Sequence, residues 1–539
     1  MPTLSWIGKD AVVNHHREVP YRLLRDVPEL GCGDPGPGNL LVEGDNLHAL
    51  KALLPYYAGQ VKCIYIDPPY NTGNEGWVYN DAVNSPLIQK WLGETVGKEA
   101  EDLSRHDKWL CMMYPRLQLL KQFLREDGSI WVSLDDNEIH SLRFLMDLVF
   151  GAENFVTTCI WEKRTTRENR RVFSFSHDYV MCFAKKLPLF EKVRGTLPLS
   201  EDVKGRYENP DNDARGSWQS VSLNAQAGHG TESQFYTLTT PGGRNLDPPS
   251  GRCWTVTKLR FDELVADNRI YFGKSGNNAP RLKKFLSEVS KGLTPQTLWR
   301  ADEVGTTDSA TKTLLSVFGG KIEFDTTPKP PELIERVAQI ATNPGDLILD
   351  SFMGSGTTAH AMLKLNAAQP DQPPRRFIGI EMEPAIAKDV TAERIRRVAT
   401  GYTNAKGEAV AGLGGGFRYC RLDAPLFSAA GVINPDVRFA QLARHVYFTE
   451  TGEPLPRERV PNTPLVGVHR GTAVYLLFNG ILGDKSRDGG NVLTRALLAQ
   501  LPPHDGPKVI FAYGCLLGEE RMRAEQLTFR QTPYEIAIA

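Results

Sequence analysis

The sequence is poor in cysteine, and its cysteines are scattered. The 539 residues include eight cysteines, none of which forms a Cys-x-x-Cys pair, and no histidines stand near them at the spacing of a zinc site. Disulfide frameworks are typical of short, cysteine-rich secreted chains. The composition therefore argues against a metal centre and against a disulfide-stabilised fold, and it indicates a reducing, cytoplasmic compartment.

An excess of charge of one sign and a long apolar run are also missing. The 63 basic residues are balanced by 64 acidic ones, so any surface that binds a polyanion must be a local basic patch. No apolar run approaches the ~20 residues that span a bilayer, and MPTLSWIGKD at the start lacks the apolar centre of a signal peptide. We expect no contact with a membrane.

What the sequence does contain is an alternation of strand and helix patterns, without an internal repeat. The apolar runs NLLVEG and VKCIYI flank a helical pattern, and SIWVSLD follows a second helical pattern over 109–124. The alternation returns in KPPELIERVAQIA, DLILDSF and RFIGIEM. Continuous apolar strands between helices are typical of a sheet that is covered on both faces. The sequence thus predicts a doubly wound α/β fold.

The alternation fades in the middle of the chain, where Gly, Pro, Asn and Arg are frequent. We interpret this stretch as a separate α+β insertion. The Gly-rich AGLGGG resembles a linker, and AVYLLFNG and VIFAYG are strand-like runs of a C-terminal domain. The predicted parts are a first part of the α/β core at 1–164, the insertion at 165–324, a second part of the core at 325–400, a linker at 401–416 and the C-terminal domain at 417–539.

The most informative stretch is IYIDPPYNTG, in which an apolar strand ends in Asp67, Pro68, Pro69 and Tyr70. Ligands of open parallel sheets bind at the carboxyl ends of the strands, and two prolines present their carbonyl groups rigidly. An adenine amino group is a poor nucleophile, because its lone pair is delocalised into the ring. Asp67 and the Pro68 carbonyl could each accept one N–H, which would free the lone pair and stabilise the charge that develops on nitrogen. Tyr70 could stack on the flipped base. The simpler alternative is a Pro-rich turn after a buried strand.

A second stretch, LILDSFMGSGTTAHAM, predicts a strand, a Gly-rich turn and a helix that begins near Thr357. Glycines let the backbone approach a ligand closely, and a helix N-terminus favours a carboxylate or phosphate. The turn is not a P-loop, because no Lys-Ser/Thr follows the glycines, and it lacks the full dinucleotide spacing. Taken alone, it could be an ordinary strand-to-helix turn.

Two acidic residues follow other predicted strands. Glu381 ends RFIGIE, 25 residues after Gly356, which matches the acidic residue that binds ribose hydroxyls in nucleoside-binding α/β folds. Alone, it could be a surface residue at a strand end. Asp45 precedes the first helical pattern, where it can cap the helix and can also contact an adenine amino group.

Together, DPPY at 67–70, FMGSG at 352–356 and Glu381 resemble the amino-methyltransferases of DNA. Asp350 follows Asp67 by 283 residues, an order that is reversed from the usual one and resembles the beta group of these enzymes. The segments DPPYNTGNEGWVYND, LLKQFLREDGSIWVSLDDNE, GAENFV, IWEKRT, YENPDNDARGSW and TFRQTPYEI are similar to modification subunits of type III restriction–modification systems. This likeness covers most of the chain.

The resemblance implies a circularly permuted Rossmann-like methyltransferase sheet with an inserted target recognition domain. It implies S-adenosylmethionine as the cofactor and the N6 amino group of adenine in duplex DNA as the methyl acceptor. It further implies a homodimer and association with an ATP-dependent restriction subunit, a helicase-nuclease that would be a separate polypeptide, because this chain contains no Walker motif.

For the site, the resemblance implies a catalytic tetrapeptide of Asp67, Pro68, Pro69 and Tyr70. It implies a set of cofactor-binding residues, namely Asp45, Asp350, Phe352, Gly354, Gly356, Thr357 and Glu381. Lys329 in TPKP would reach the carboxylate of the cofactor. Alternatively, Lys329 is a solvated charge before a helix whose first turn holds two prolines.

The segment KRTTRENRR at 163–171 is the strongest local basic stretch that we consider for DNA contact. Basic side chains that follow a strand beside a flipped base can track phosphates. The candidate residues are Lys163, Arg164, Arg167, Arg170 and Arg171. The alternative is a solvated loop.

Other functions stay open on sequence grounds. Methylation of cytosine N4 uses the same amino chemistry, although Asp rather than Ser at position 67 favours adenine. A catalytically silent DNA-recognition subunit is disfavoured by the intact motifs. Methylation of RNA or of a protein side chain is a further alternative, and a solitary regulatory adenine methyltransferase could carry the same sequence.

Overall fold

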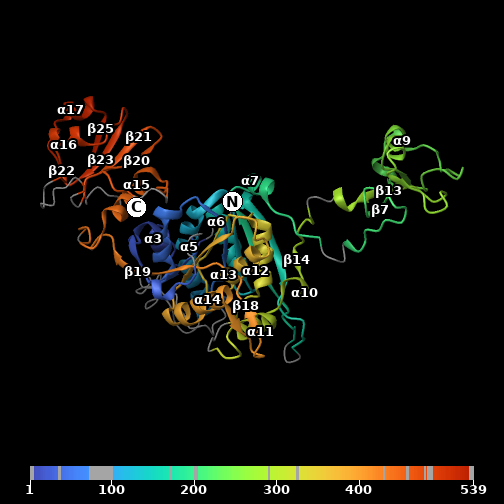
Figure 1. Cartoon of the computed structure of the whole chain (residues 1–539), viewed down its shortest axis with the longest axis horizontal. Coiled ribbons are helices and arrows are strands. Elements are labelled where there is room, and N and C mark those ends of the chain that lie inside the picture. Colours follow the sequence, from blue (N-terminus) through green and yellow to red (C-terminus); the bar gives the residue numbers. More distant parts are fainter. Residues whose placement is uncertain are drawn as a thin grey trace. The chain divides into compact units, whose positions relative to one another are not determined.

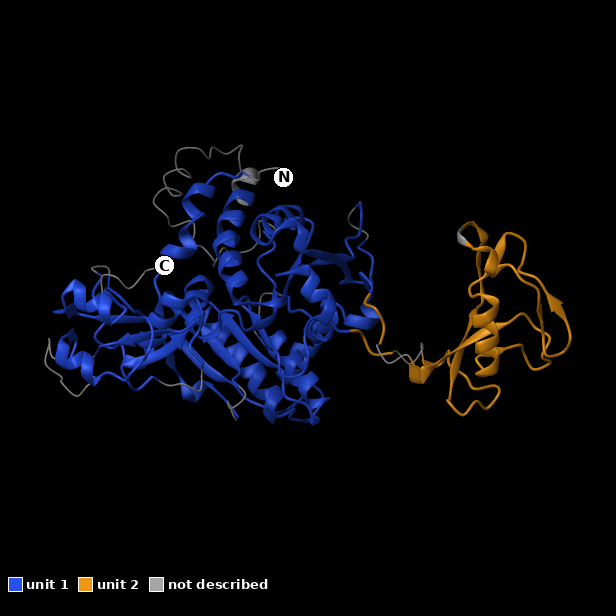
Figure 2. Cartoon of the chain, turned by 90° about the horizontal axis from the view of Figure 1, so that it is seen from above, with its two compact units in different colours: residues 1–195, 296–539 blue, residues 196–295 orange. Residues whose placement is uncertain are grey.

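The computed structural model forms two compact units (Figures 1 and 2). Unit 1 comprises Met1–Gly195 and Gln296–Ala539, and unit 2 comprises Thr196–Pro295. The structure describes residues 5–33, 38–71, 101–168, 172–199, 204–288, 292–322, 327–428, 431–456, 461–478, 481 and 490–532. No helix in these ranges is both long enough and apolar enough to cross a membrane.

Unit 1 is built on a ten-stranded mixed sheet. The strand order is β1 (Arg22–Asp26), β19 (Arg418–Pro425), β2 (Leu40–Glu43), β16 (Arg376–Glu381), β15 (Leu347–Asp350), β3 (Val61–Ile66), β4 (Leu124–Leu134), β6 (His177–Ala184), β5 (Phe155–Glu162) and β14 (Leu298–Trp299). The strands from β19 to β4 in this order are parallel. The strands β1 and β6 run antiparallel to their neighbours. The protein is therefore a mixed α/β protein, in agreement with the class predicted from sequence.

The central strands are buried because helices cover them. Every residue of β3 and of β15 is buried, as expected for strands with helices on both faces. One group of helices that pack on one another consists of α3 (Asn46–Tyr57), α5 (Glu101–Phe123) and α6 (Ile139–Phe150), and a second consists of α12 (Pro331–Ala341), α13 (Thr357–Ala367) and α14 (Glu393–Thr400). The crossovers from β2 to β3 and from β15 to β16 run in opposite directions across the sheet. Because such crossovers are as a rule right-handed, α3 and α13 are expected on opposite faces.

The strands that carry the two motifs are neighbours in this sheet. Strand β15 pairs with β3 in parallel, with Ile348 opposite Cys63 and Leu349 opposite Ile64. From β3 the chain continues to β4, and from β15 it continues in the other direction to β16. A crevice opens at the carboxyl ends of two such strands, and it is the usual ligand site of an open α/β sheet.

Shorter elements complete this part of unit 1. They are α1 (Lys9–Val12), α2 (His15–Glu18), η1 (Pro28–Leu30), η4 (Ala152–Asn154), α7 (Leu187–Val193), α10 (Ala301–Val304), α11 (Thr307–Val317), the π-helical turn η8 (Ile386–Ala392), and the paired strands β17 (Gly401–Thr403) and β18 (Ala409–Ala411).

The C-terminal part of unit 1 has a smaller sheet with a hydrophobic core of its own. The sheet has the order β20 (Leu465–His469), β21 (Thr472–Leu476), β23 (Lys508–Ala512) and β25 (Leu527–Gln531), and β22 (Val492–Leu493) pairs with β24 (Gly514–Cys515). The helices are α15 (Phe439–Thr451), which packs against α3, α16 (Arg495–Gln500) and α17 (Glu519–Ala524).

Three boundaries differ from those expected from sequence. The compact insertion is Thr196–Pro295, which is narrower than 165–324, because β6, β14, α10 and α11 belong to unit 1. The stretch 401–416 is not merely a linker, since it contains the β17–β18 hairpin. Strand β19 lies in the large sheet beside β2, so residue 417 does not begin a separate domain. A strand that joins a sheet edge from a distant part of the chain leaves no local signal of its partner.

The described residues of unit 2 form short strands, the helix α9 and 3-10 turns, and the unit has a separate core. Its elements are β7 (Trp218–Ser222), β8 (Asn224–Gln226), η5 (Ala227–His229), η6 (Glu232–Gln234), β9 (Leu238–Thr239), β10 (Asn245–Leu246), β11 (Arg252–Trp254), α9 (Lys258–Ala266), β12 (Ile270–Tyr271), β13 (Arg281–Phe285) and η7 (Leu286–Glu288). Strand β13 pairs with both β12 and β7.

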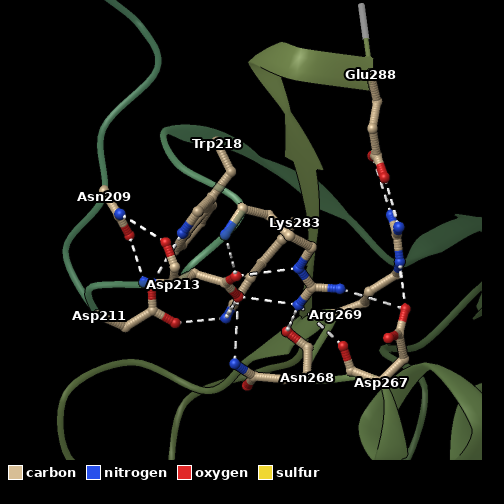
Figure 3. Close-up of polar contacts among 10 residues, drawn as sticks. Asn209, Asp211, Asp213, Trp218, Asp267, Asn268, Arg269, Lys283 and Glu288 are labelled. Atoms are coloured by element: carbon tan, nitrogen blue, oxygen red, sulfur yellow. Dashed lines mark hydrogen bonds and ion pairs between the residues drawn. The ribbon is translucent and has the colours of Figure 1, made fainter.

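A buried lysine organises the polar side of unit 2 (Figure 3). The Lys283 side chain is fully buried, and its ammonium contacts the carboxylates of Asp211 and Asp213. Asp213 also accepts a hydrogen bond from Arg215 at 2.9 Å, and Trp218 donates to Asp211 at 2.9 Å. A buried charge is tolerated only when it is paired in this way, so the network ties β13 to the loop that precedes β7.

We expect the Asp213→Asn substitution to destabilise unit 2 by about 3 kcal/mol, because the buried Lys283 charge loses one of its two carboxylates. Hydrogen exchange over residues 204–288 measures this loss. The hydrogen bond from Arg215 holds the pKa of Asp213 well below its usual range. The contribution of Asp213 to the free energy of unfolding is therefore complete above about pH 4 and is lost as the pH falls further.

The control is Asp262→Asn. Asp262 pairs with Lys258 at 2.5 Å, but both side chains are about half exposed, and exposed pairs contribute at most about 1 kcal/mol. If residues 204–288 were equally protected from hydrogen exchange in the two variants, the structural role of the Lys283 network would be contradicted.

Candidate active site

The predicted site residues from both motifs come together at one edge of the large sheet. Because β2, β16, β15 and β3 are parallel, their carboxyl ends meet there. Asp45, Glu381, Asp350 and Asp67 lie at or just beyond these ends. Strand β4 also ends at this edge, and the antiparallel β6 begins there.

Asp67 has one oxygen paired and one oxygen without a partner. Its Oδ2 accepts a hydrogen bond from Lys329 Nζ at 2.5 Å. Its Oδ1 is buried and has no hydrogen-bond partner among the described residues. A buried acceptor without a partner is costly, so Oδ1 is an atom at which a ligand donor would be stabilised.

The two prolines differ in what their carbonyl groups do. The indole Nε1 of Trp109 donates a hydrogen bond to the Pro69 carbonyl at 2.8 Å, and Trp109 is completely buried in α5. No described residue donates to the Pro68 carbonyl. Trp109 thus fixes the turn and leaves Pro68 as the proline carbonyl that is open to a ligand.

The ring of Tyr70 lies beside the paired lysine. Lys329 Nζ is 4.9 Å from the centroid of the Tyr70 ring, within the range of a cation–π contact. The Tyr70 hydroxyl is buried and has no partner in the described part of the chain. Burial holds the pKa of Tyr70 well above its usual value, so the side chain stays a neutral phenol.

A buried carboxylate contacts the residue that follows the turn. Asn71 adopts a left-handed backbone with φ 56, and its amide donates to Glu138 Oε1. The same oxygen is 2.6 Å from His106 Nδ1, and the Glu138 side chain is fully buried. This contact holds the residue directly after the tetrapeptide in a strained conformation.

Asp350 shapes the glycine turn after β15. Its carboxylate accepts hydrogen bonds from the Phe352 N–H at 3.0 Å and from Thr358 Oγ1 at 2.5 Å. Burial raises the pKa of Asp350 to about 7, and these two hydrogen bonds oppose that shift. Both Asp350 oxygens are therefore engaged within the turn, and Phe352 is itself buried.

The two glycines in the turn need their conformations for different reasons. Gly354 has φ 49, and a Cβ there would have only the Phe352 carbonyl oxygen nearby, at 4.0 Å. Open space thus lies beside Gly354. Gly356 has φ 81 and precedes α13, and a Cβ there would lie 3.3 Å from Thr391. The turn is tight on the η8 side and open at Gly354.

Glu381 closes the turn from the neighbouring strand. Its Oε2 accepts the Gly354 N–H at 2.8 Å, and its Oε1 accepts the Glu383 N–H at 3.0 Å. Burial raises the pKa of Glu381. The alternative of a surface residue at a strand end is excluded, because Glu381 is buried.

Comparison with known proteins identifies the family of the chain. A family model for N6/N4 amino-methyltransferases, described as "DNA methylase", matches residues 61–393, a range that holds the DPPY turn, unit 2, the glycine turn and Glu381. The protein is a member of this DNA methylase family.

Three relatives illustrate the likeness of this DNA methylase to characterised enzymes. The type III restriction-modification enzyme StyLTI Mod subunit of Salmonella typhimurium is 33% identical over 72% of this chain and 60% of its own length. The EcoPI Mod subunit of Escherichia phage P1 is 31% identical over 72% of this chain and 65% of its own length. The type II methyltransferase M1.MboII of Moraxella bovis is 52% identical over 60% of this chain and 84% of its own length. The chain thus spans less than two thirds of the Mod subunits that it matches.

Lys329 in the DNA methylase is not a solvated charge. Its side chain is 10% exposed, its Nζ pairs with Asp67, and its backbone carbonyl accepts a hydrogen bond from Thr357 Oγ1 at 3.2 Å. Thr357 in turn receives a hydrogen bond from Arg394 at 2.9 Å. Lys329 therefore joins the first turn of α13 to the Asp67–Tyr70 turn.

Asp45 is the helix cap that the sequence predicts, and it has a second partner. Its Oδ1 accepts the His48 N–H at 3.1 Å, and its Oδ2 pairs with Arg116 at 3.1 Å. Arg116 also donates to Asn46 at 2.5 Å, and Asn46 donates to the Ser351 carbonyl at 2.9 Å. This chain of contacts ties the start of α3 to the glycine turn of the methylase.

Trp109, Arg116 and Arg394 were not anticipated as parts of the site. Trp109 and Arg116 are seven residues apart on α5, so they lie on the same face of the helix. This spacing could have predicted from the sequence that Arg116 faces the same way as Trp109. Arg394 is fully buried in α14, and this burial lowers its pKa to about 9. The amphipathic pattern of α14 did not predict that this charged residue faces inward.

The basic segment after β5 is only partly free for DNA. Lys163 pairs with the buried Asp178 at 2.6 Å, and burial raises the pKa of Asp178 to about 6. Arg164 lies 3.6 Å from Glu168 and remains 46% exposed, and Arg167 is exposed. The other two candidates, Arg170 and Arg171, lie outside the described residues.

The raised pKa of Asp350 gives a pH-dependent prediction. An acid whose pKa rises on folding destabilises the fold as the pH climbs from the unfolded value of about 4 toward the folded one. We expect the melting temperature of the protein to fall from pH 5 to pH 8 relative to that of the Asp350→Asn variant, as measured by calorimetry. Asp346→Asn, whose carboxylate pairs with Arg125 at 2.9 Å, is the control. If the melting temperatures of the protein and of Asp350→Asn changed with pH in the same way, the raised pKa of Asp350 would be refuted.

Proposed function

We propose that this protein transfers a methyl group from S-adenosylmethionine to the N6 amino group of adenine in DNA. The observation that carries the proposal is the pairing of β3 with β15, which brings the Asp67–Tyr70 turn beside the glycine turn and Glu381. Family membership supports a DNA methylase, and the strand order supports a circularly permuted Rossmann-like core into which unit 2 is inserted as the target recognition domain.

The acceptor atoms of the catalytic turn fit an exocyclic amino group. Such a group has two N–H bonds, and Asp67 Oδ1 and the Pro68 carbonyl are two acceptors of this turn that have no described donor. Hydrogen bonds to both hydrogens direct the nitrogen lone pair out of conjugation. The same acceptors stabilise the positive charge that grows on nitrogen as it forms the new bond to carbon, and Asp67 can take the proton that the nitrogen then loses.

The residues of the glycine turn fit the proposed cofactor. The open space beside Gly354 lets backbone and ligand approach closely, and Glu381 offers a carboxylate next to it that suits ribose hydroxyls. Asp45, Phe352, Gly356 and Thr357 border the same turn. When bound, the cofactor supplies an electrophilic methyl group on a sulfonium, so the protein itself needs to provide orientation and electrostatic stabilisation.

The biological setting that we propose is a type III restriction–modification system. The similarity to two Mod subunits supports this setting, which entails a homodimer and a separate ATP-dependent restriction subunit. A solitary regulatory adenine methyltransferase is the second candidate, and similarity to a type II methyltransferase shows that the likeness extends beyond Mod subunits. Single-molecule sequencing of DNA from cells with and without the protein tests the function, because N6-methyladenine in one asymmetric motif supports it and N4-methylcytosine would contradict it.

Asp67→Asn should lower the rate of methyl transfer by at least about 100-fold, because one acceptor becomes a donor where charge develops. Cofactor affinity, measured by calorimetry, should change little, since Asp67 belongs to the base-binding side. Retained turnover in a single-turnover assay would contradict the catalytic role of Asp67.

Lys329 has two candidate roles, and its contact with Asp67 decides which one we propose. A lysine that binds the cofactor carboxylate would set cofactor affinity, whereas a lysine that positions Asp67 would set the rate. We expect Lys329→Met to reduce kcat by about 100-fold with a small change in cofactor affinity, and Lys329→Arg to restore part of kcat.

The control for Lys329 is Lys364→Met. Lys364 lies on α13 and pairs with Glu332 and Glu335, not with Asp67. Its variant should therefore keep both kcat and cofactor affinity. A large loss of cofactor affinity in Lys329→Met with normal kcat at saturation would show that Lys329 instead binds the cofactor carboxylate.

A further inference from the structure

Apolar side chains are exposed on the connection between β5 and β6. Val172 is 96% exposed, Phe173 is 77% exposed and Phe175 is 50% exposed. Single exposed apolar residues are ordinary, but neighbouring large ones in a polar segment are typical of a surface that a partner covers. The proposed methyl transfer involves none of these residues.

The described part of this connection is anchored at its base. The Arg164 N–H donates to the Ser176 carbonyl at 3.2 Å, and the Glu168 N–H donates to Ser174 Oγ at 3.0 Å. Below them, the Lys163 carbonyl accepts the Thr307 N–H at 3.0 Å. The exposed apolar side chains therefore extend from an anchored hairpin.

The hairpin leaves the sheet at the edge that holds the catalytic turn. Glu162 at the end of β5 is opposite His177 at the start of β6, and β4 and β6 separate β5 from β3. Three strand spacings correspond to roughly 14 Å, and the major groove of DNA is about 12 Å wide. The hairpin is thus within reach of the duplex that would deliver a base to Asp67.

The charge of the hairpin favours DNA over a second copy of the chain as its partner. Arg164 and Arg167 are exposed on the same connection as the apolar residues. Basic side chains combined with exposed apolar ones are typical of proteins that contact phosphates and insert a wedge between bases.

We propose that Val172 and Phe173 enter the base stack beside the target and occupy the gap that a flipped base leaves. This inference rests on the proposed function, in which the target base leaves the duplex to reach Asp67. An apolar side chain in the gap compensates for lost stacking, so the paired duplex opens more readily.

The test compares two labelled duplexes of the same random sequence, one intact and one with a central abasic site, in binding to the full chain by fluorescence anisotropy. The abasic site is a ready-made gap, so the protein should bind this duplex about tenfold more tightly than the intact one. The double variant Val172→Ser/Phe173→Ser should lose most of this preference and keep its affinity for the intact duplex. Arg164→Ala/Arg167→Ala should instead weaken both complexes equally.

Leu516→Ser is the matched control, because Leu516 is 75% exposed and lies outside the hairpin. A protein without preference for the abasic duplex, or a double variant that retains the preference, would overturn the proposal. A double variant that only loses self-association in sedimentation would overturn it in favour of a contact between copies. The binding assay needs no methyl transfer, so failure of the proposed function is detected separately, as absence of methylated DNA.

Discussion

The pairing of β3 with β15 is the constraint on which the rest of the structure depends. Two strands that are far apart in the chain share backbone hydrogen bonds at the centre of the sheet, and the chain leaves them in opposite directions. This arrangement opens the crevice and puts an aspartate turn beside a glycine turn. Without this pairing, each motif would be an ordinary strand end. The buried polar contacts around it, through Arg116 and Asn46 on one side and Lys329 on the other, join the same two halves again.

The α/β class, the strands that carry the motifs and the Asp45 cap were predictable, because they follow from local patterns: continuous apolar strands, helical spacing and a capping residue before an apolar face. The gathering of Asp45, Asp67, Asp350 and Glu381 at one edge was predictable for a related reason. Each of them ends an apolar run, and the ends of parallel strands meet.

What could not be predicted depends on contacts between distant segments. Strand β19 joins β2 from a distant part of the chain. Strand β6 folds back as an antiparallel strand where the alternation fades, so the compact unit Thr196–Pro295 is narrower than the predicted insertion. Arg394 carries a charge that sequence patterns place outside, yet hydrogen bonds to Ser355 and Thr357 compensate its burial. Lys163 appears free in sequence, but Asp178 comes beside it only when β5 and β6 pair.

Some carboxylates at this edge of the sheet have both oxygens hydrogen-bonded, and one does not. This difference separates the residues that hold the shape of the site from the residue that would bind a ligand. Asp45, Asp350 and Glu381 each have both oxygens engaged by donors of the chain, so they hold the shape of the site before any ligand arrives. Asp67 differs, because Lys329 holds Oδ2 and leaves Oδ1 buried without a described partner. Preorganised acceptors stabilise developing charge without reorganising. Because Asp45, Asp350 and Glu381 are already paired, Asp67 Oδ1 is the oxygen of these four carboxylates that is left to accept a hydrogen bond from a ligand amino group.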